Sequence, residues 1–481
     1  MRRIAYISLF GLFGLSGCMV GPDYHKPKLA LPAAYKAAPG WVAAAPADAA
    51  PKGEWWKAFG DPVLDKLEAQ VAVNNATLAA DYYAYRQAVA LAQEERGSLF
   101  PTLDLTGSAT RSAENSSSVT NYGGPTSSGS LEGQASWTLD IWGKIRRQVQ
   151  SDVASAQVSA ADLANATLSA QAELASDYVS MRTADANIVL LRQTVASYQE
   201  SLRIARNQYA AGTVSQSDVI TAQTELDGAQ SSLVAEGATR AQYEHAIAVL
   251  TGHAPAELSI PEGPQIADIP VPPPQVPSTL LERRPDIAAA ERSMAEQNAL
   301  IGVAVGAYYP DLSLSALGGF SANPITGLFN ASSALWSLGT TATGDLFEGG
   351  ARGQAVEAAK ASYLQSVETY RQTVLTAFQD VENDLSNLRI YAKQAEVQQR
   401  AVADATRAAQ IALNEYRAGT ADYTTVVTAQ VTLLSDRQTL LSIQQNRLLA
   451  SIALYQDLGG GFKESDLPSA GQIQGKLPFA P

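Results

Sequence analysis

Few side chains in this sequence have the type and spacing that enzyme chemistry requires. The histidines His25, His245 and His253 form no HExxH pair that could hold a catalytic metal, and Cys18 is the only cysteine. One cysteine allows no disulfide within the chain and no thiolate metal cluster. The "GGGF" beginning at position 459 follows an expected helix, so it predicts a helix end and no phosphate loop. The sequence therefore predicts a protein that is not an enzyme and needs no metal or cofactor.

Cys18 has a different expected chemistry, which is attachment to lipid. It ends the stretch "LSGC", which follows Arg2, Arg3 and an apolar run at 4–15 that is too short for a membrane span of ~20 residues. The stretch resembles the lipobox of bacterial lipoproteins, in which this thiol is acylated and becomes the mature N-terminus, with palmitate among the chains. Lasting attachment needs more than one acyl chain. An ordinary signal peptide with an incidental cysteine is the alternative. Met19, where an aspartate would favour inner-membrane retention, favours the outer membrane.

Charge and length restrict the class of protein further. The chain has 34 basic and 47 acidic residues and a formal net charge of −13, which argues against nucleic acid as a partner. Its 481 residues exceed one ordinary domain. No segment after the leader predicts a membrane helix, so a membrane crossing would require a closed β-barrel.

The sequence contains an internal duplication. "YAAGTVSQSDVITAQ" from Tyr209 and "YRAGTADYTTVVTAQ" from Tyr416 match at eight of fifteen positions. "SLFPTLDLTGS" at 98 resembles "AYYPDLSLSAL" at 307, and "LDIWGKIR" at 139 resembles "GDLFEGGAR" at 344. The offsets stay between 205 and 209, and a proline-rich seam at 264–277 separates the two halves.

Each half predicts one very long helix followed by a turn and a second long helix. Apolar or small residues recur every three or four positions, as in a coiled coil. The first seam comprises Tyr178, Met181, Ala184, Ile188, Leu191, Val195, Tyr198, Leu202 and Ala205, and the second Val381, Leu385, Leu388, Ala392, Ala395, Val402, Ala405, Ala409 and Ala412. At 1.5 Å per residue such helices are roughly 100 Å long. Gly212 and Gly419 can adopt the left-handed conformation that ends a helix, so each predicts a tight hairpin turn.

Four shorter segments alternate apolar and polar residues, near 101–111, 131–140, 311–321 and 334–345. This period suits a strand with one face in lipid and the other in water. A soluble hairpin with one buried face is the alternative. Because four strands cannot close a membrane barrel, copies of the chain would have to complete it. This reasoning leaves the number of copies open.

In this layout the chain resembles the TolC-like outer-membrane factor family, in the lipoprotein branch that serves tripartite efflux pumps. The resemblance covers essentially the whole mature chain. It rests on the lipobox, "WWKAFGDPVL" from Trp55, "ERRPDI" from Glu282, the paired "YxxGT" turns and "DLGGGF" from Asp457. It implies a mixed α/β membrane protein, a homotrimer whose 12-stranded outer-membrane β-barrel continues into a long periplasmic α-helical barrel with an equatorial domain.

The resemblance also implies partners and domains. A periplasmic adaptor would dock on the hairpin tips and link the duct to an inner-membrane transporter of the RND type. The expected domains are a signal peptide at 1–17, a lipid-anchored and equatorial segment at 18–62, a first repeat at 63–258, a proline-rich linker at 259–282, a second repeat at 283–458 and an equatorial tail at 459–481.

Several residues match the family's latch at the periplasmic aperture. Asp218 matches an aspartate that accepts a hydrogen bond from a neighbouring helix pair, and Tyr416 matches the donor. Thr425 and Thr428 stand where relatives carry aspartates, which predicts a less cation-selective mouth. Ala421 replaces a latching arginine; Arg417 could take its place, and a solvated arginine is the alternative.

The sequence therefore predicts the outer-membrane exit duct of a tripartite efflux pump, extending into the periplasm. A duct for type I protein secretion is an alternative, and a periplasmic coiled-coil adaptor is a weaker one because adaptors lack paired amphipathic strands. No binding pocket for a substrate can be recognised from the sequence, so the sequence does not predict which substrate is transported.

Overall fold

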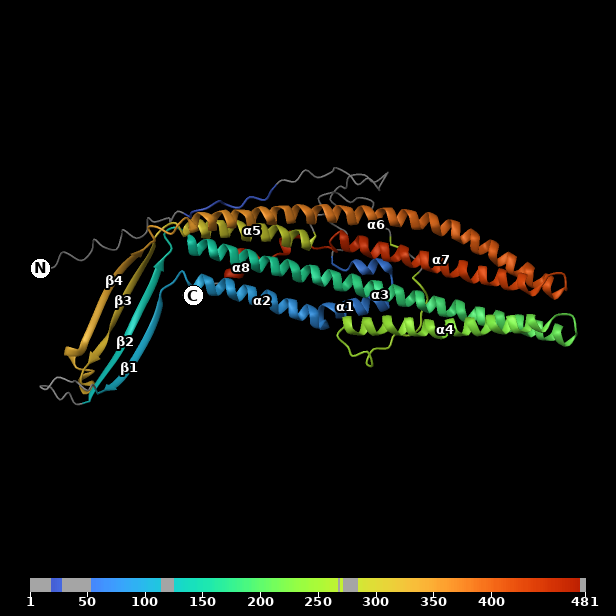
Figure 1. The fold of residues 1–481 in the computed structure, drawn as a ribbon, viewed down its shortest axis with the longest axis horizontal. Helices are drawn as coiled ribbons and strands as arrows, with labels where there is room; N and C mark the ends of the chain where they lie inside the picture. The colour runs from blue at the N-terminus through green and yellow to red at the C-terminus, as the bar shows by residue number, and fades with distance from the viewer. Residues whose placement is uncertain (1–18, 28–52, 114–124, 267–268, 271–283, 476–481) are drawn as a thin grey trace.

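The fold comes from a computed structural model, which describes residues 19–27, 53–113, 125–266, 269–270 and 284–475. The expected signal peptide, Cys18 and most of the expected linker lie outside these ranges. Within them the molecule is long and narrow, with a sheet at one end and two helical hairpin tips at the other (Figure 1).

The duplication expected from the sequence appears as three pairs of helices of equal length. The pairs are α2 (Ala76–Gly97) with α5 (Pro285–Gly306), α3 (Lys144–Ala210) with α6 (Ala351–Arg417), and α4 (Gln216–Leu250) with α7 (Tyr423–Asp457). They have 22, 67 and 35 residues respectively. A 67-residue helix is about 100 Å long, which agrees with the expectation.

The remaining elements are short. They are η1 (Trp55–Phe59), α1 (Pro62–Asn74), η3 (Ile325–Gly327), η4 (Ala331–Ser333), η5 (Glu464–Asp466) and α8 (Ala470–Gln474).

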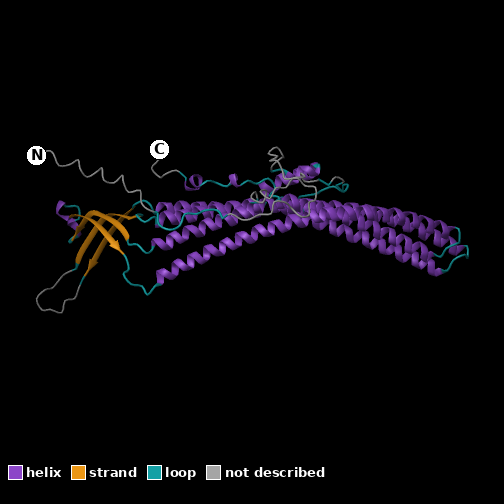
Figure 2. Ribbon diagram, turned by 90° about the horizontal axis from the view of Figure 1, so that it is seen from above, coloured by secondary structure: helices purple, strands orange, loops and turns teal. Residues whose placement is uncertain are grey.

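The four expected strands form one antiparallel sheet in the order β1-β2-β3-β4. They are β1 (Thr102–Ser112), β2 (Thr126–Leu139), β3 (Asp311–Ala322) and β4 (Ala334–Thr343). The sheet curves at the end of the helical layer (Figure 2). β1 and β4 are its two edges, so neither outer edge is paired within the described chain.

Strand bounds differ most from expectation in β2, which begins at Thr126 rather than near 131. The stretch "TSSGS", residues 126–130, is rich in serine and precedes the expected strand. It is strand because its backbone pairs with β1, for example Ser130 with Ser108 and Thr126 with Ser112. β4 ends at Thr343 rather than near 345, just before Gly344 and the turn into α6. Pairing with neighbouring strands, rather than local propensity, sets these bounds.

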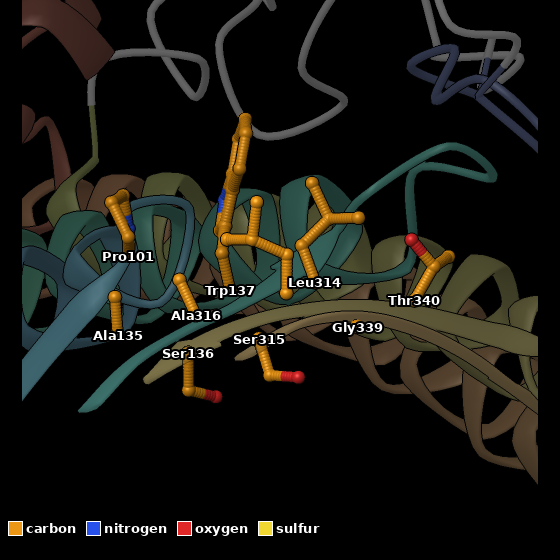
Figure 3. Close-up of a pocket in the computed structure, with 10 residues that line it drawn as sticks. Pro101, Ala135, Ser136, Trp137, Leu314, Ser315, Ala316, Gly339 and Thr340 are labelled. Atoms are coloured by element: carbon orange, nitrogen blue, oxygen red, sulfur yellow. The ribbon is translucent and has the colours of Figure 1, made fainter. Parts of the chain in front are cut away.

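The register separates apolar and polar side chains onto opposite faces of the sheet. Leu103 on β1 is level with Ala135, Trp137 on β2 with Leu314, and Ala316 on β3 with Leu338. These residues share one face. All of them except Leu103 line a shallow hollow of about 410 Å³, together with Pro101, Ser136, Ser315, Gly339 and Thr340. In Figure 3 Trp137, Leu314 and Ala316 point to one side of the sheet, whereas Ser136 and Ser315 point to the other.

The helices form a layer in which α3 is central. Near the sheet the side-by-side order is α2-α3-α5-α6, and toward the tips it is α4-α3-α7-α6 (Figures 1 and 2). Nearly all positions of the two expected seams are buried or half-buried, including Tyr178, Leu191, Val381 and Ala409. The edges of the layer are therefore α6 on one side and α2 with α4 on the other. Across the described ranges, none of the helices has the length and apolarity that crossing a membrane would need.

Two sequence motifs that lie far apart in the chain meet near the middle of the layer. The Arg284 guanidinium, from "ERRPDI", donates to Asp286 at 2.9 Å and to Asp457, from "DLGGGF", at 3.0 Å. This contact joins the start of α5 to the end of α7. The largest apolar cluster of the described residues also lies near the middle of the layer, and in it Trp55 and Trp56 pack against α3 and α7.

One acidic residue on α1 is buried without compensation. Glu68 is fully buried, and within the described residues neither carboxyl oxygen has a hydrogen-bond partner. Burial, with a smaller contribution from the Asp65 carboxylate, raises the pKa of Glu68 from 4.5 to about 9. The folded protein therefore keeps Glu68 neutral at pH 7.

We expect Glu68 to make the protein less stable as pH rises. The folded state holds a proton that the unfolded chain releases, so stability falls between about pH 4.5 and about pH 9. The slope reaches up to about 1.4 kcal/mol per pH unit. Glu68→Gln should flatten this dependence in thermal unfolding followed by circular dichroism, and should stabilise the protein at pH 8. Glu257→Gln at an exposed site is the control. An unchanged slope in Glu68→Gln would contradict the assignment.

Candidate aperture at the hairpin tips

The two expected hairpin turns have the same backbone. In the first, Gly212 has φ 75° and Thr213 N–H donates to the Gln208 carbonyl at 3.0 Å. In the second, Gly419 has φ 73° and Thr420 N–H donates to the Glu415 carbonyl at 2.9 Å. A positive φ favours glycine, so these two residues end α3 and α6 as expected.

Asp218 lies in the first turn of α4, half-buried at the tip. Its carboxylate accepts a hydrogen bond from the Ser215 hydroxyl at 3.0 Å. The internal repeat places Thr425 at the equivalent position of α7. Thr425 and Thr428 are both exposed, and the Thr428 hydroxyl donates to the Thr424 carbonyl of its own helix. The threonines therefore lie at the second tip, where the sequence placed them.

Tyr416 is buried at the last turn of α6, where its ring packs edge-on against Tyr423 at 5.1 Å. Burial, with a smaller contribution from Asp218, raises the pKa of Tyr416 to about 12. The two residues are thus near each other. The expected hydrogen bond between them is not formed within the chain, because the Tyr416 hydroxyl has no partner among the described residues. Whether a second copy supplies one stays a prediction.

Among the described residues near the tips, three hydrogen bonds or ion pairs connect the two hairpins directly, and the sequence did not reveal them. The Gln208 amide donates to the Tyr416 carbonyl at 3.0 Å, and the Gln430 amide donates to the buried Ser201 hydroxyl at 3.0 Å. The Arg417 guanidinium lies 3.4 Å from a Glu200 carboxylate oxygen. Arg417 is thus paired with Glu200 while both side chains remain exposed, and its role in the latch stays a prediction.

A further carboxylate at the second tip was also missed. Asp422 precedes α7, is exposed, and makes no capping hydrogen bond with its side chain. It lies three positions before Thr425, so the second hairpin keeps an acidic group although the family's aspartate positions hold threonine. The only signal was its place before a helix, where aspartate is common for capping reasons alone.

Comparison with known proteins identifies the architecture. The profile of the family described as outer membrane efflux protein matches residues 67–253 and 276–460, one block in each half of the chain. The chain belongs to the outer membrane efflux protein family. The two matched blocks together include both hairpin tips and all four strands.

Curated relatives and solved structures agree with this family. The chain is 30% identical to the pyoverdine export outer membrane protein OpmQ of Pseudomonas aeruginosa, over 96% of this chain and 98% of that protein. It is 29% identical to the probable efflux pump outer membrane protein TtgC of Pseudomonas putida, with 94% of each covered. The outer-membrane channel OprN matches with a TM-score of 0.84 at 29% identity, over 92% of this chain and 99% of that one.

Family membership confirms several expectations. The protein is an outer-membrane efflux protein that extends into the periplasm, its fold is that of the TolC-like channels, and it is not an enzyme. Among the described residues no group of three or more His, Cys, Asp or Glu is arranged to hold a metal ion.

We expect the links at the tips to restrict the channel. Asp218→Ala and Arg417→Gln should each raise single-channel conductance in planar bilayers. Arg417→Gln removes the ion pair with Glu200 that joins the two hairpins, and Asp218→Ala removes the carboxylate expected to accept a hydrogen bond from a neighbouring helix pair. The effect of Arg417→Gln should shrink at high salt, since salt screens an exposed ion pair. Asp227→Ala, at an exposed site on the same helix as Asp218, is the control and should not change conductance. Unchanged conductance in Asp218→Ala would remove Asp218 from the latch.

Proposed function

We propose that this protein is the exit duct of a tripartite efflux pump, built as a homotrimer with a 12-stranded barrel and a gated periplasmic mouth. The observation that carries the proposal is the four-stranded sheet with one apolar face and two unpaired edges. In lipid, each unpaired backbone group costs several kcal/mol, so the β1 edge of one copy must pair with the β4 edge of the next. Three copies supply twelve strands, an even number that can close.

The helical layer supports the same ring. Its two edges continue the two edges of the sheet, since α2 leads into β1 and α6 follows β4. Apolar side chains are exposed along both helical edges, so a neighbouring copy could bury them. They are Leu364, Leu375, Ile390, Val397 and Ile411 on α6, and Tyr83, Leu91, Ile220, Val234 and Val249 on α2 and α4.

The position of the N-terminal segment supports a lipid anchor on Cys18. Val20 N–H donates to the Trp142 carbonyl at 3.0 Å, and Arg147 donates to the carbonyls of Val20 and Gly21. These contacts hold residues next to Cys18 where the sheet meets the helices. In the proposed orientation this is the inner surface of the outer membrane, where acyl chains on Cys18 could insert. The expected signal peptide at 1–17 and the domain boundaries stay part of the proposal.

The proposed partners rest on the resemblance to tripartite efflux ducts and on the efflux-pump relatives, and the length of the helices fits them. The tips of α3 and α6 lie about 100 Å from the sheet, deep in the periplasm. A periplasmic adaptor would contact these tips, hold the latch of Asp218 and Tyr416 open, and join the duct to an RND-type inner-membrane transporter. Thr425 and Thr428 would face the mouth as neutral groups.

Adjacent genes would separate efflux from protein secretion. A proton-driven pump beside an adaptor gene is the result expected here, and complementation should then restore efflux of a fluorescent pump substrate in a strain lacking this gene. An ABC exporter in that place, with secretion lost on deletion, would favour the secretion duct.

We expect neighbouring residues of β1 to respond oppositely to a charge. Leu105 is exposed on the apolar face, and Thr106 lies on the opposite face, level with Glu132. Leu105→Arg should cost about 2–4 kcal/mol near the bilayer midplane. It should therefore reduce the folded oligomer recovered from outer membranes, whereas Thr106→Arg should be tolerated. Equal recovery of both variants would contradict a lipid-facing apolar surface.

A further inference from the structure

The two junctions that lead from strand to long helix are copies of each other. The first reads Asp140, Ile141, Trp142, Gly143, and the second reads Asp345, Leu346, Phe347, followed by Glu348 and a pair of glycines, so the second is two residues longer. Gly143 and Gly350 have φ 79° and 88°, and each precedes its helix directly.

Each junction is held by an aspartate and an arginine. Asp140 binds Arg146 at 2.9 Å, and Asp345 binds Arg352 at 2.8 Å. The two junctions therefore resemble each other in backbone ending and in charge pairing as well as in sequence.

The aromatic residue of the first junction has a partner within the chain. Trp142 stacks on Tyr309 with ring centroids 4.6 Å apart, and its indole N–H donates to the Pro310 carbonyl at 3.0 Å. Tyr309 and Pro310 form the turn between α5 and β3. This contact joins the end of a strand in the first half to the start of a strand in the second half.

The aromatic residue of the second junction is exposed. Leu346 has 104% and Phe347 91% of the full side-chain exposure, so neither is covered by the described chain. Both follow β4, which is the edge of the sheet, and precede α6, which is the edge of the helical layer. Among the described residues of one copy, no turn packs on Leu346 and Phe347 as Tyr309 and Pro310 pack on Trp142.

The missing counterpart is present at the opposite edge of the chain. Phe100 and Pro101 form the turn between α2 and β1, and Pro101 is the internal repeat of Pro310. The turns share their backbone bonds, since Phe100 N–H donates to the Gly97 carbonyl and Tyr309 N–H donates to the Gly306 carbonyl, both at 3.1 Å or less. At the β4 edge, the Leu346–Phe347 junction therefore has no turn to pack on. At the β1 edge, the Phe100–Pro101 turn has no junction packed on it.

We propose that Leu346 and Phe347 of one copy pack on the Phe100–Pro101 turn of the next copy, repeating between chains the contact that Trp142 makes within the chain. This inference rests on the ring of copies proposed above and adds the residues that join them where the sheet meets the helices. The side chain of phenylalanine has no N–H, so the contact between chains is apolar and lacks the hydrogen bond that the Trp142 indole makes. A closed ring would alternate the two kinds of contact around its circumference.

Photo-crosslinking of the full-length protein tests the contact. p-Benzoylphenylalanine placed at position 347 should give covalently joined chains on irradiation in outer-membrane vesicles. Mass spectrometry should locate the adduct in the peptide that contains Phe100 and Pro101. The same probe at Phe329, which is exposed in the connection between β3 and β4 at the opposite end of the sheet, should give no adduct with that peptide. An adduct within one chain, with lipid only, or with another segment of the neighbour would overturn the inference.

A second variant separates failure of the contact from failure of the ring. Phe347→Ala should lower the temperature at which the oligomer dissociates in SDS, and Phe329→Ala, at the opposite end of the sheet, should leave it unchanged. If the unmodified protein forms the oligomer but the probe at 347 does not reach the Phe100–Pro101 turn, only the contact is wrong. If the unmodified protein forms no oligomer, the contact and the proposed duct are both wrong.

Discussion

The structure depends on one constraint, which is that a sheet with an apolar face cannot end in lipid with unpaired backbone groups. This chain supplies four strands, and the outer edges of β1 and β4 are free among the described residues. The helical layer also has two uncovered edges, because apolar residues are exposed on α6 at one side and on α2 and α4 at the other. In the proposed duct a single copy would therefore be an arc of a ring, in the sheet and in the helical layer alike.

The internal duplication accounts for the regular arrangement of helices and strands within one chain. The halves contribute helices of identical length, and α3 packs against members of both halves, whereas α6 lies at an edge. Equivalent residues consequently have different surroundings. Trp142 is covered by Tyr309, whereas Phe347 is exposed, and Asp218 of the first tip corresponds to Thr425 of the second. We propose that these departures from internal symmetry lie where neighbouring copies, or the mouth of the duct, replace contacts within the chain.

Sequence patterns predicted the features that depend on local periodicity. The three-and-four spacing placed Tyr178 and Leu191 in a helical seam, and Gly212 and Gly419 were correctly assigned to turns. Contacts between distant segments were not predictable. Glu200 and Arg417 are 217 positions apart, and Glu200 already pairs with Arg203 one turn away. The start of β2 was missed because serine and glycine are weak strand formers, and the burial of Glu68 has no sequence signature. The roles of Asp218, Tyr416, Thr425 and Thr428 at the aperture stay predictions.

The mass of the protein in detergent tests the central claim most directly. Native mass spectrometry of the full-length protein, extracted from outer membranes, should give a complex of three chains. The free edges of the sheet can close only with copies, and the family resemblance implies that there are three. A chain that stays a monomer, or that needs no detergent to remain in solution, would contradict the account.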